Sequence, residues 1–147
     1  YFAAEAEDRR RLVEEETTLP DHSPIWVSYS AIDMGQIKDI FDGDPSTLIR
    51  TAEANPLRLA VDFRSPRAVQ SVEVRVGGTP TRVTLRTCPA NQEDCREQVI
   101  EVEETPHPRS VTFTCDDPAA VARVEVDVLS LRDGEPCHVH LWEVTFR

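Results

Sequence analysis

The chain contains 147 residues, with 16 Lys or Arg and 27 Asp or Glu, which gives a formal net charge of -11. This acidic balance repels phosphate groups, so it argues against nucleic acid and anionic lipid as partners and favours cations. No apolar run approaches the ~20 residues of a membrane-spanning helix, so we expect one domain without direct membrane insertion by this segment. Because the sequence starts at Tyr1 with no Met and no signal-type apolar region, we expect it to be part of a longer protein.

Residues 1–24 are predicted to form a short N-terminal helix followed by a Pro-containing linker. The stretch from Phe2 to about Thr17 is rich in Ala, Glu and Arg, which favour a helix, and few apolar residues line one face of it. Two interpretations remain open. The helix is either a stalk that follows a preceding membrane segment or domain, or an N-terminal element docked through Leu12 and Val13. The two prolines of the linker then end it, because they remove backbone donors.

From Ile25 onward, apolar and polar residues alternate in the pattern of half-buried β-strands. Turn signals rich in Pro, Gly, Asn and Asp separate the alternating stretches. About eight short antiparallel strands with turns at this spacing predict an all-β sandwich over residues 25–147. The expected strands are 25–29, 57–63, 69–76, 82–87, 99–102, 111–114, 121–129 and 139–146.

The four cysteines lack the Cys-x-x-Cys pairs of zinc sites, so we expect disulfide bonds. Cys88 and Cys95 flank a turn-rich segment between two strand patterns, while Cys115 and Cys137 each lie at a strand end. Among the three pairings that four cysteines allow, we favour Cys88 with Cys95 and Cys115 with Cys137. Disulfides imply an extracytoplasmic location, secreted or on the outward-facing part of a membrane protein. The alternative is four buried thiols in a cytosolic protein.

An acidic turn, Ile-Phe-Asp-Gly-Asp-Pro-Ser-Thr at residues 40–47, precedes the strand 57–63, which ends in Val-Asp-Phe. Gly43 can adopt the positive φ that lets such a loop wrap a hard cation. This order resembles the discoidin domains, also called coagulation factor V/VIII type C domains, and the related galactose-binding-like carbohydrate-binding modules. Residues 65–74 and the closing Leu-Trp-Glu-Val-Thr-Phe are similar to two further strands of that family. The resemblance covers residues 25–147 and implies a galactose-binding-like jelly-roll β-sandwich.

In that family the acidic turn binds a structural calcium ion, and the resemblance implies the same here. The implied ligands are main-chain carbonyls near Ile40, oxygens of Asp42, Asp44 and Thr47, and the carboxylate of Glu143. Calcium takes roughly six to eight oxygen ligands, a number that this set approaches. From the residues alone, the segment indicates an ordinary turn in which a carboxylate caps backbone amides, as most Asp-Gly pairs form. An ion held in this way is structural, because catalysis would need an open coordination position.

The family's ligands sit where loops leave the sandwich, so for a glycan we expect polar contacts from Arg50, Glu53, Asn55 and Arg58. The alternative for these residues is ordinary solvated surface. Many carbohydrate-binding members of the family carry an aromatic residue shortly after the Thr of the turn, but Ile49 follows it here. A sugar bound at this place would depend on polar contacts.

No catalytic arrangement is evident in the sequence. His138 and His140 share one face of a predicted strand, which can bind a metal, but no third ligand of fitting spacing is evident, and Trp142 continues that face. The chain lacks a Gly-x-Ser-x-Gly elbow and a Gly-rich phosphate loop. Asp42 and Asp44 lie too close together in one turn for the paired carboxylates of a glycosidase. We therefore expect no enzymatic activity in this domain.

These features favour a non-catalytic accessory or binding domain of a larger extracytoplasmic or membrane-anchored protein, related to carbohydrate and with a structural Ca²⁺ site. The expected partners are a glycan and the other domains of the parent protein, which is itself a candidate enzyme such as a glycosyltransferase or glycosidase. The alternative is a protein-interaction or structural spacer domain with no small-molecule ligand, because a fold alone does not decide function.

Overall fold

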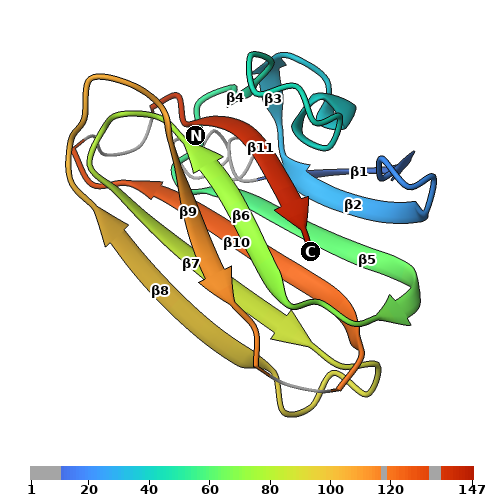
Figure 1. Cartoon of the computed structure of the whole chain (residues 1–147). Helices are drawn as coiled ribbons and strands as arrows, with labels where there is room; N and C mark the ends of the chain where they lie inside the picture. Colours follow the sequence, from blue (N-terminus) through green and yellow to red (C-terminus); the bar gives the residue numbers. More distant parts are fainter. Residues whose placement is uncertain (1–10, 117–118, 133–136) are drawn as a thin grey trace.

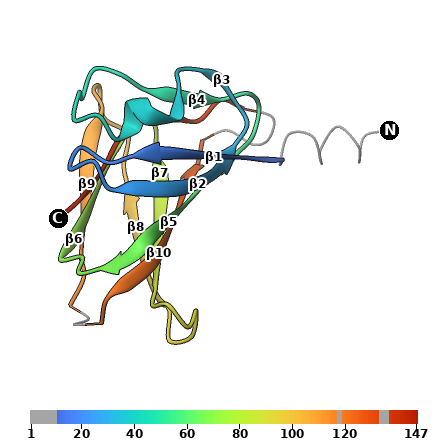
Figure 2. The same ribbon diagram turned by 90° about the vertical axis from the view of Figure 1, so that its right-hand side faces the viewer.

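Apolar residues at every second position give each strand one face that turns inward and one that turns outward. The computed structural model describes residues 11–116, 119–132 and 137–147, and in it this alternation produces two antiparallel sheets packed face to face. For example, β6 (Ser71–Val76) buries its three valines and leaves the residues between them partly exposed. In Figure 1, β6 and β9 cross in front of β7 and β10, and Figure 2 shows the same layers from the side.

The larger sheet has six strands in the order β1-β2-β5-β10-β7-β8. Its strands are β1 (Leu12–Thr18), β2 (Pro24–Ser30), β5 (Leu57–Arg67), β7 (Thr81–Cys88), β8 (Arg96–Val102) and β10 (Val121–Ser130). The second sheet has five strands in the order β3-β4-β11-β6-β9. Besides β6, its strands are β3 (Ile32–Met34), β4 (Ile49–Thr51), β9 (Arg109–Thr114) and β11 (His140–Phe146).

The core lies between the two sheets and is filled mostly by β-branched and aromatic side chains. Val27, Val61 and Val126 of the six-stranded sheet are fully or almost fully buried, as is Phe113 of the five-stranded sheet. A short 3₁₀ helix, η1 (Ile37–Ile40), leads from β3 into the acidic turn and buries Ile37 and Ile40. This burial fixes the start of the turn against the core.

All eight predicted strands are present, and the all-β sandwich is confirmed. The predicted helix is wrong for Leu12 to Thr17, because these residues form β1 and pair with β2 from Leu12↔Ser30 to Thr18↔Pro24. A solvated helix without an apolar stripe gains little from packing, whereas pairing with β2 satisfies the backbone and half-buries Val13 and Thr17. The sheet therefore includes residues before 25. The rest of the predicted helix, residues 1–10, lies outside the described residues.

One of the two predicted disulfides is confirmed. Cys88 and Cys95 are bonded across the turn between β7 and β8, at the lower end of Figure 1. The predicted Cys115–Cys137 bond is wrong, because the two residues lie at opposite ends of β6. Cys115 donates its amide to Gln70 just before β6, whereas Cys137 lies beside Glu53 at the far end. A strand of this length separates its ends by about 17 Å, too far for a bond.

Within the described residues, no helix is long and apolar enough to cross a lipid bilayer.

Candidate functional site

The acidic turn between η1 and β4 closes on itself through its own carboxylates. Gly43 has the positive φ, 77°, that the sequence predicted. Asp42 accepts a hydrogen bond from the Asp44 amide at 2.8 Å, and Asp44 accepts two from Ser46, at 2.9 Å from the amide and 2.6 Å from the hydroxyl. The pKa of Asp44 is lowered by its bonds with Ser46. These contacts favour the ionised form of the Asp44 carboxylate.

Thr47 lies among three oxygen atoms of the same turn. Its hydroxyl is 3.0 Å from the Asp39 carbonyl oxygen, 3.1 Å from the Asp44 carbonyl oxygen and 3.3 Å from a carboxylate oxygen of Asp42. One hydroxyl proton cannot serve all three acceptors at once. The turn therefore gathers more oxygen atoms than its own donors satisfy.

Glu143 reaches this turn from β11 and is 9% exposed. Its Oε2 accepts a hydrogen bond from the Gly43 amide at 3.2 Å, whereas its Oε1 is buried and has no partner in the described part of the chain. Burial raises the pKa of Glu143 to about 7, the Gly43 amide opposes this rise, and the nearby Asp42 and Asp44 carboxylates add to it. A buried carboxylate oxygen without a donor is costly unless a proton or a cation meets it.

The donor set fits a calcium ion in chemical type. Hard oxygen atoms from Asp42, Asp44 and Glu143 surround the turn, and the Thr47 hydroxyl and main-chain carbonyls add neutral oxygen atoms. Within residues 11–116, 119–132 and 137–147, no three His, Cys, Asp or Glu side chains form a ready-made metal cluster. Main-chain oxygen atoms would therefore have to complete the shell, as the prediction that includes the Ile40 carbonyl requires.

The four residues predicted to contact a glycan do not form one surface. Arg50 lies on β4 and makes a two-point ion pair with Asp33, at 2.8 and 3.1 Å. Asn55 binds the backbone of Ser130 in both directions, donating at 3.1 Å and accepting at 2.9 Å, so its amide joins two parts of the backbone.

The other two predicted residues lie elsewhere. Glu53 is exposed after β4, where its carbonyl oxygen accepts the Cys137 amide. Arg58 projects from β5 onto the outer face of the six-stranded sheet and lines a separate hollow there. The predicted loop site is therefore divided among several places.

A hollow of about 380 Å³ lies instead at the loop end of the sandwich, near the beginning of β11. We call it the loop-end hollow. His138, His140 and Trp142 line it from one face of the chain, as the alternation in the sequence predicted. Its remaining wall is made by Met34, Leu48, Gly77, Gly78, Thr79, Thr81, Val128, Ser130, Arg132 and Val139.

Trp142 is the central aromatic group of the loop-end hollow. Its ring centroid is 5.8 Å from that of His140, with the two planes tilted by 30°. A Cβ atom at Gly77 would lie 3.3 Å from the indole, so a larger residue there would press on the ring. At Gly78 a Cβ would lie 2.1 Å from the Thr105 carbonyl oxygen, which excludes any side chain. The glycine pair thus lets the β6–β7 turn lie close to both the indole and the neighbouring loop.

The surroundings of the two histidines determine where their protons lie. Burial lowers the pKa of His140, and the charges of Arg50 and His138 lower it further, while Asp33 opposes them. His140 is therefore neutral at pH 7 and carries both a donor and an acceptor. His138 Nδ1 lies 2.8 Å from the Thr51 carbonyl oxygen, and because a carbonyl only accepts, that nitrogen carries a proton.

The sequence placed His138, His140 and Trp142 on one face, but it did not indicate which other residues surround them. The alternation of His138, His140 and Trp142 indicated a shared face, and no third metal ligand was predicted for the two histidines. Only the pairing of β11 with β4, which sets His140 opposite Arg50, brings the Asp33 ion pair beside them. Contacts of this kind depend on strand register and leave no local motif.

The fold is a galactose-binding-like jelly roll of the kind found in family 32 carbohydrate-binding modules, as the resemblance predicted. No protein-family model matches the sequence, and no curated protein matches it significantly.

Three solved structures illustrate the similarity. The family 32 module of Clostridium perfringens NanJ in complex with galactose is 17% identical with a TM-score of 0.62, covering 90% of this chain and 98% of that one. The lectin domain of lectinolysin complexed with Lewis B antigen is 16% identical with a TM-score of 0.60, covering 82% and 90%. The C-terminal domain of a Bacteroides fragilis chitobiase is 13% identical with a TM-score of 0.62, covering 90% and 97%. With sequence identities this low, the structural similarity establishes a shared fold and nothing more specific.

Proposed function

We propose that this domain is a non-catalytic carbohydrate-binding module that holds a sugar in the loop-end hollow. The observation that carries the proposal is the Trp142 indole, which lies beside the neutral His140 imidazole in a hollow of about 380 Å³. The shared fold supports it, because the NanJ module and the lectinolysin domain were solved with galactose and with Lewis B antigen.

The chemistry of the hollow suits a sugar ring. An indole offers a flat apolar surface for the C–H face of a hexose, and the surrounding imidazoles and hydroxyls can bond to its hydroxyl groups. The Arg50–Asp33 ion pair fixes the polar edge beside His138, whose Nδ1 lies 3.6 Å from Asp33. A site with one aromatic surface and few ordered polar groups should bind with millimolar affinity.

We further propose that the acidic turn binds a structural calcium ion through Asp42, Asp44, Thr47 and Glu143, with main-chain oxygen near Ile40. The partnerless Oε1 of Glu143 and the crowded oxygen atoms around Thr47 support this assignment. When bound, calcium would neutralise the clustered carboxylates. The acidic turn could then lie against Glu143 of β11 without repulsion between the carboxylates.

The proposed setting is extracytoplasmic, as an accessory domain next to other domains of a longer protein. The Cys88–Cys95 disulfide supports an oxidising compartment. A domain that only binds a glycan contributes by holding a neighbouring module near its substrate, through an increase in effective concentration.

The proposal can be tested by titrating the ¹⁵N-labelled, calcium-loaded protein with D-galactose, N-acetyl-D-glucosamine and bacterial cell-wall oligosaccharides. We expect shifts of the Trp142 indole N–H and of the amides of Gly77 and His140. Trp142→Ala should weaken binding about fivefold or more, since stacking contributes on the order of 1 kcal/mol or more.

The chain provides a matched control, because it contains only two tryptophans. Trp26 lies on the outward face of β2 and is 37% exposed, so Trp26→Ala removes an indole of the same size away from the hollow. It should leave the Trp142-dependent shifts in place. Binding that is unchanged in Trp142→Ala, or the absence of shifts around Trp142 with every sugar, would favour the spacer interpretation.

A further inference from the structure

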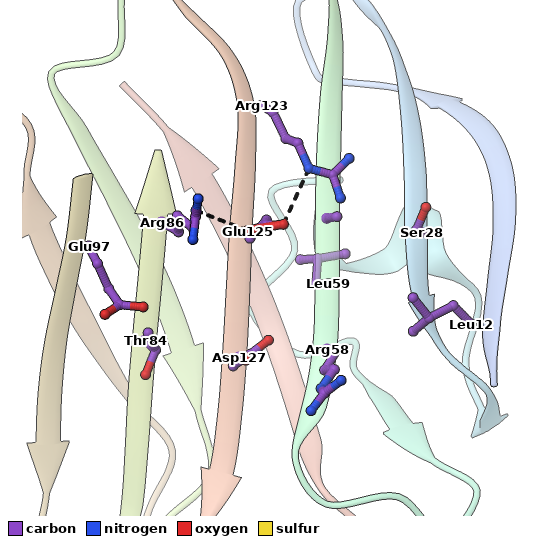
Figure 3. A pocket seen from close by; sticks show the side chains of 11 residues that line it. Leu12, Ser28, Arg58, Leu59, Thr84, Arg86, Glu97, Arg123, Glu125 and Asp127 are labelled. Atoms are coloured by element: carbon purple, nitrogen blue, oxygen red, sulfur yellow. Dashed lines mark hydrogen bonds and ion pairs between the residues drawn. The ribbon is translucent and has the colours of Figure 1, made fainter. Parts of the chain in front are cut away.

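The outer face of the six-stranded sheet has a second hollow, of about 340 Å³, on the opposite side from the core. We call it the outer hollow. Figure 3 shows the charged side chains that surround it, on β5, β7, β8 and β10. Its floor is made of small residues: Ser28 and Ala60 face outward yet are each only 8% exposed, because longer neighbours overhang them. A row of small side chains among long ones creates space that a flat sheet face does not have.

One side of the outer hollow is held by ion pairs. Arg123 contacts Asp62 at 2.7 Å and Glu125 at 3.4 Å, and Arg86 contacts Glu125 from the other side at 3.6 Å. These pairs are directed along the sheet, as the dashed lines in Figure 3 indicate for Glu125. The network holds the Arg123 guanidinium by two hydrogen bonds and the Arg86 guanidinium by a longer ion pair.

The other side contains opposite charges that do not meet. Asp127 of β10 stands directly across from Arg58 of β5 in the strand register. Within the described part of the chain, no hydrogen bond or ion pair joins these two side chains, and Figure 3 draws none. Burial raises the pKa of Asp127, Arg58 opposes this rise, and Glu125 and Glu97 add to it. A half-buried carboxylate and a guanidinium thus face a shared space from adjacent strands.

The chemistry of this space selects the kind of ligand. A guanidinium only donates and a carboxylate only accepts, so a bridging molecule must offer an acceptor and a donor a few ångströms apart. Neighbouring hydroxyl groups on a sugar ring do both. The lining includes three Arg and three carboxylates, Arg58, Arg86, Arg123, Glu97, Glu125 and Asp127, so it carries no formal net charge. A neutral polyhydroxylated ligand is therefore favoured over an anion or a cation.

We propose that the outer hollow is a second carbohydrate-binding site, which takes one neutral sugar unit between Arg58 and Asp127, with Ala60 as its floor and Ser28 and Thr84 on either side. Arg58 and Asp127 bond to neighbouring hydroxyls, and Thr84 of β7 lies on the other side of Asp127, opposite it in the strand register. Ala60 presents a small apolar surface to the C–H groups of the ring. The site is separate from the loop-end hollow and does not depend on it. A chain with both sites could bind two units of one polysaccharide, or two chains.

The experiment uses the calcium-loaded ¹⁵N-labelled protein and three probes: D-galactose, N-acetyl-D-glucosamine and D-glucuronate, each raised to about 50 mM because the affinity expected for one small ring is millimolar. If the ligand is a neutral sugar, galactose and N-acetylglucosamine should shift the amides of Ser28, Ala60, Thr84 and Asp127. The dissociation constant of glucuronate, from the same titration, should be at least about tenfold higher. The Trp142→Ala protein should retain these shifts, which separates them from the loop-end hollow.

Two variants test the geometry. Ala60→Leu fills the hollow and leaves every charge in place, and Asp127→Ala removes the acceptor, so each should weaken the outer-face shifts at least about tenfold. Should Ala60→Leu not fold, Asp127→Ala decides alone.

Arg64→Gln is the matched control, since Arg64 projects outward from the same strand but pairs with Glu16 beyond the hollow. It should leave the affinity unchanged. No shifts at the outer face with either neutral sugar, or shifts that persist unchanged in both variants, would overturn the proposal, even if the loop-end hollow binds. Stronger binding of glucuronate than of galactose would overturn the assignment to neutral sugars.

Discussion

The acidic turn and the loop-end hollow differ in how much of the chain each one needs. The turn takes nearly all of its polar groups from residues 39–47, and only Glu143 comes from a distant strand. The hollow takes its walls from β3, the residue before β4, the β6–β7 turn, the end of β10 and the start of β11. A site made from consecutive residues leaves a motif in the sequence. One made by strand pairing is visible only after the sheets have formed.

The largest expected effect concerns the turn. If Asp42, Asp44, Thr47 and Glu143 bind calcium only in the folded state, calcium at ~1,000 times its dissociation constant should stabilise the fold by about 4 kcal/mol. Thermal melts in excess calcium and in EDTA measure the difference directly. Asp42→Ala should behave in calcium as the parent protein does in EDTA.

Glu93→Ala is the matched control for this test, because Glu93 is an exposed carboxylate in the turn between β7 and β8. It should keep the full calcium response. Equal melting temperatures with and without calcium, together with no metal in elemental analysis, would reduce the turn to ordinary capping of backbone amides.

The same contrast explains what the sequence could predict. Alternation identified eight strands, and the positive φ of Gly43 followed from its place between Asp42 and Asp44. The alternation pattern could not identify β1. Its residues favour a helix locally, and they form a strand because the edge of β2 offers a backbone to pair with. The strand register also determines where the predicted glycan-contact residues lie. It places Arg58 on the outer face of the six-stranded sheet and Asn55 beside Ser130.

Cysteine chemistry extends the comparison to covalent bonds. The Cys88–Cys95 bond closes a short local loop, and its removal in a Cys88→Ser, Cys95→Ser double variant should cost about 2 to 3 kcal/mol in the loop-entropy model. The urea midpoint of unfolding measures this loss. Burial and the charge of Asp116 raise the pKa of Cys115, so its thiol should react slowly in the native state.

Counting thiols checks the pairing separately. After denaturation without a reductant, mass spectrometry should find two alkylated cysteines, at 115 and 137, and one intact bond. Four alkylated cysteines would contradict the local bond, and none would restore the long-range pairing that the strand register excludes.

A pH dependence sharpens the interpretation of Glu143. Its pKa is raised to about 7 from an ordinary value of 4.5, so the folded state holds this proton more tightly than the unfolded state does. In EDTA, stability from this group should be complete below about pH 4.5 and lost as the pH rises through 7, by up to about 2 kcal/mol after solvent screening. Urea unfolding in EDTA, from about pH 5 to about pH 8, measures this loss of the free energy of unfolding.

Glu143→Gln should remove this slope, because an amide does not titrate, while the control Glu93→Gln should retain it. Saturating calcium should also reduce the slope, since the ion takes the place of the proton. A parent protein whose stability rises over this range in EDTA would show that the Glu143 carboxylate is not held as the burial of its Oε1 implies.

The smallest effect separates structural residues from ligand contacts near the hollow. Asn55 exchanges two hydrogen bonds with the Ser130 backbone, so Asn55→Ala should lower the free energy of unfolding by about 1 to 2 kcal/mol. Its dissociation constant for galactose, measured on the folded protein by NMR, should stay unchanged. Arg50→Ala should do the reverse: its ion pair with Asp33 is partly exposed and adds less than about 1 kcal/mol to stability, but it orders the polar edge of the hollow. Lost sugar binding in Asn55→Ala at undiminished stability would place the ligand near Asn55, where the sequence alone had put it, and away from Trp142.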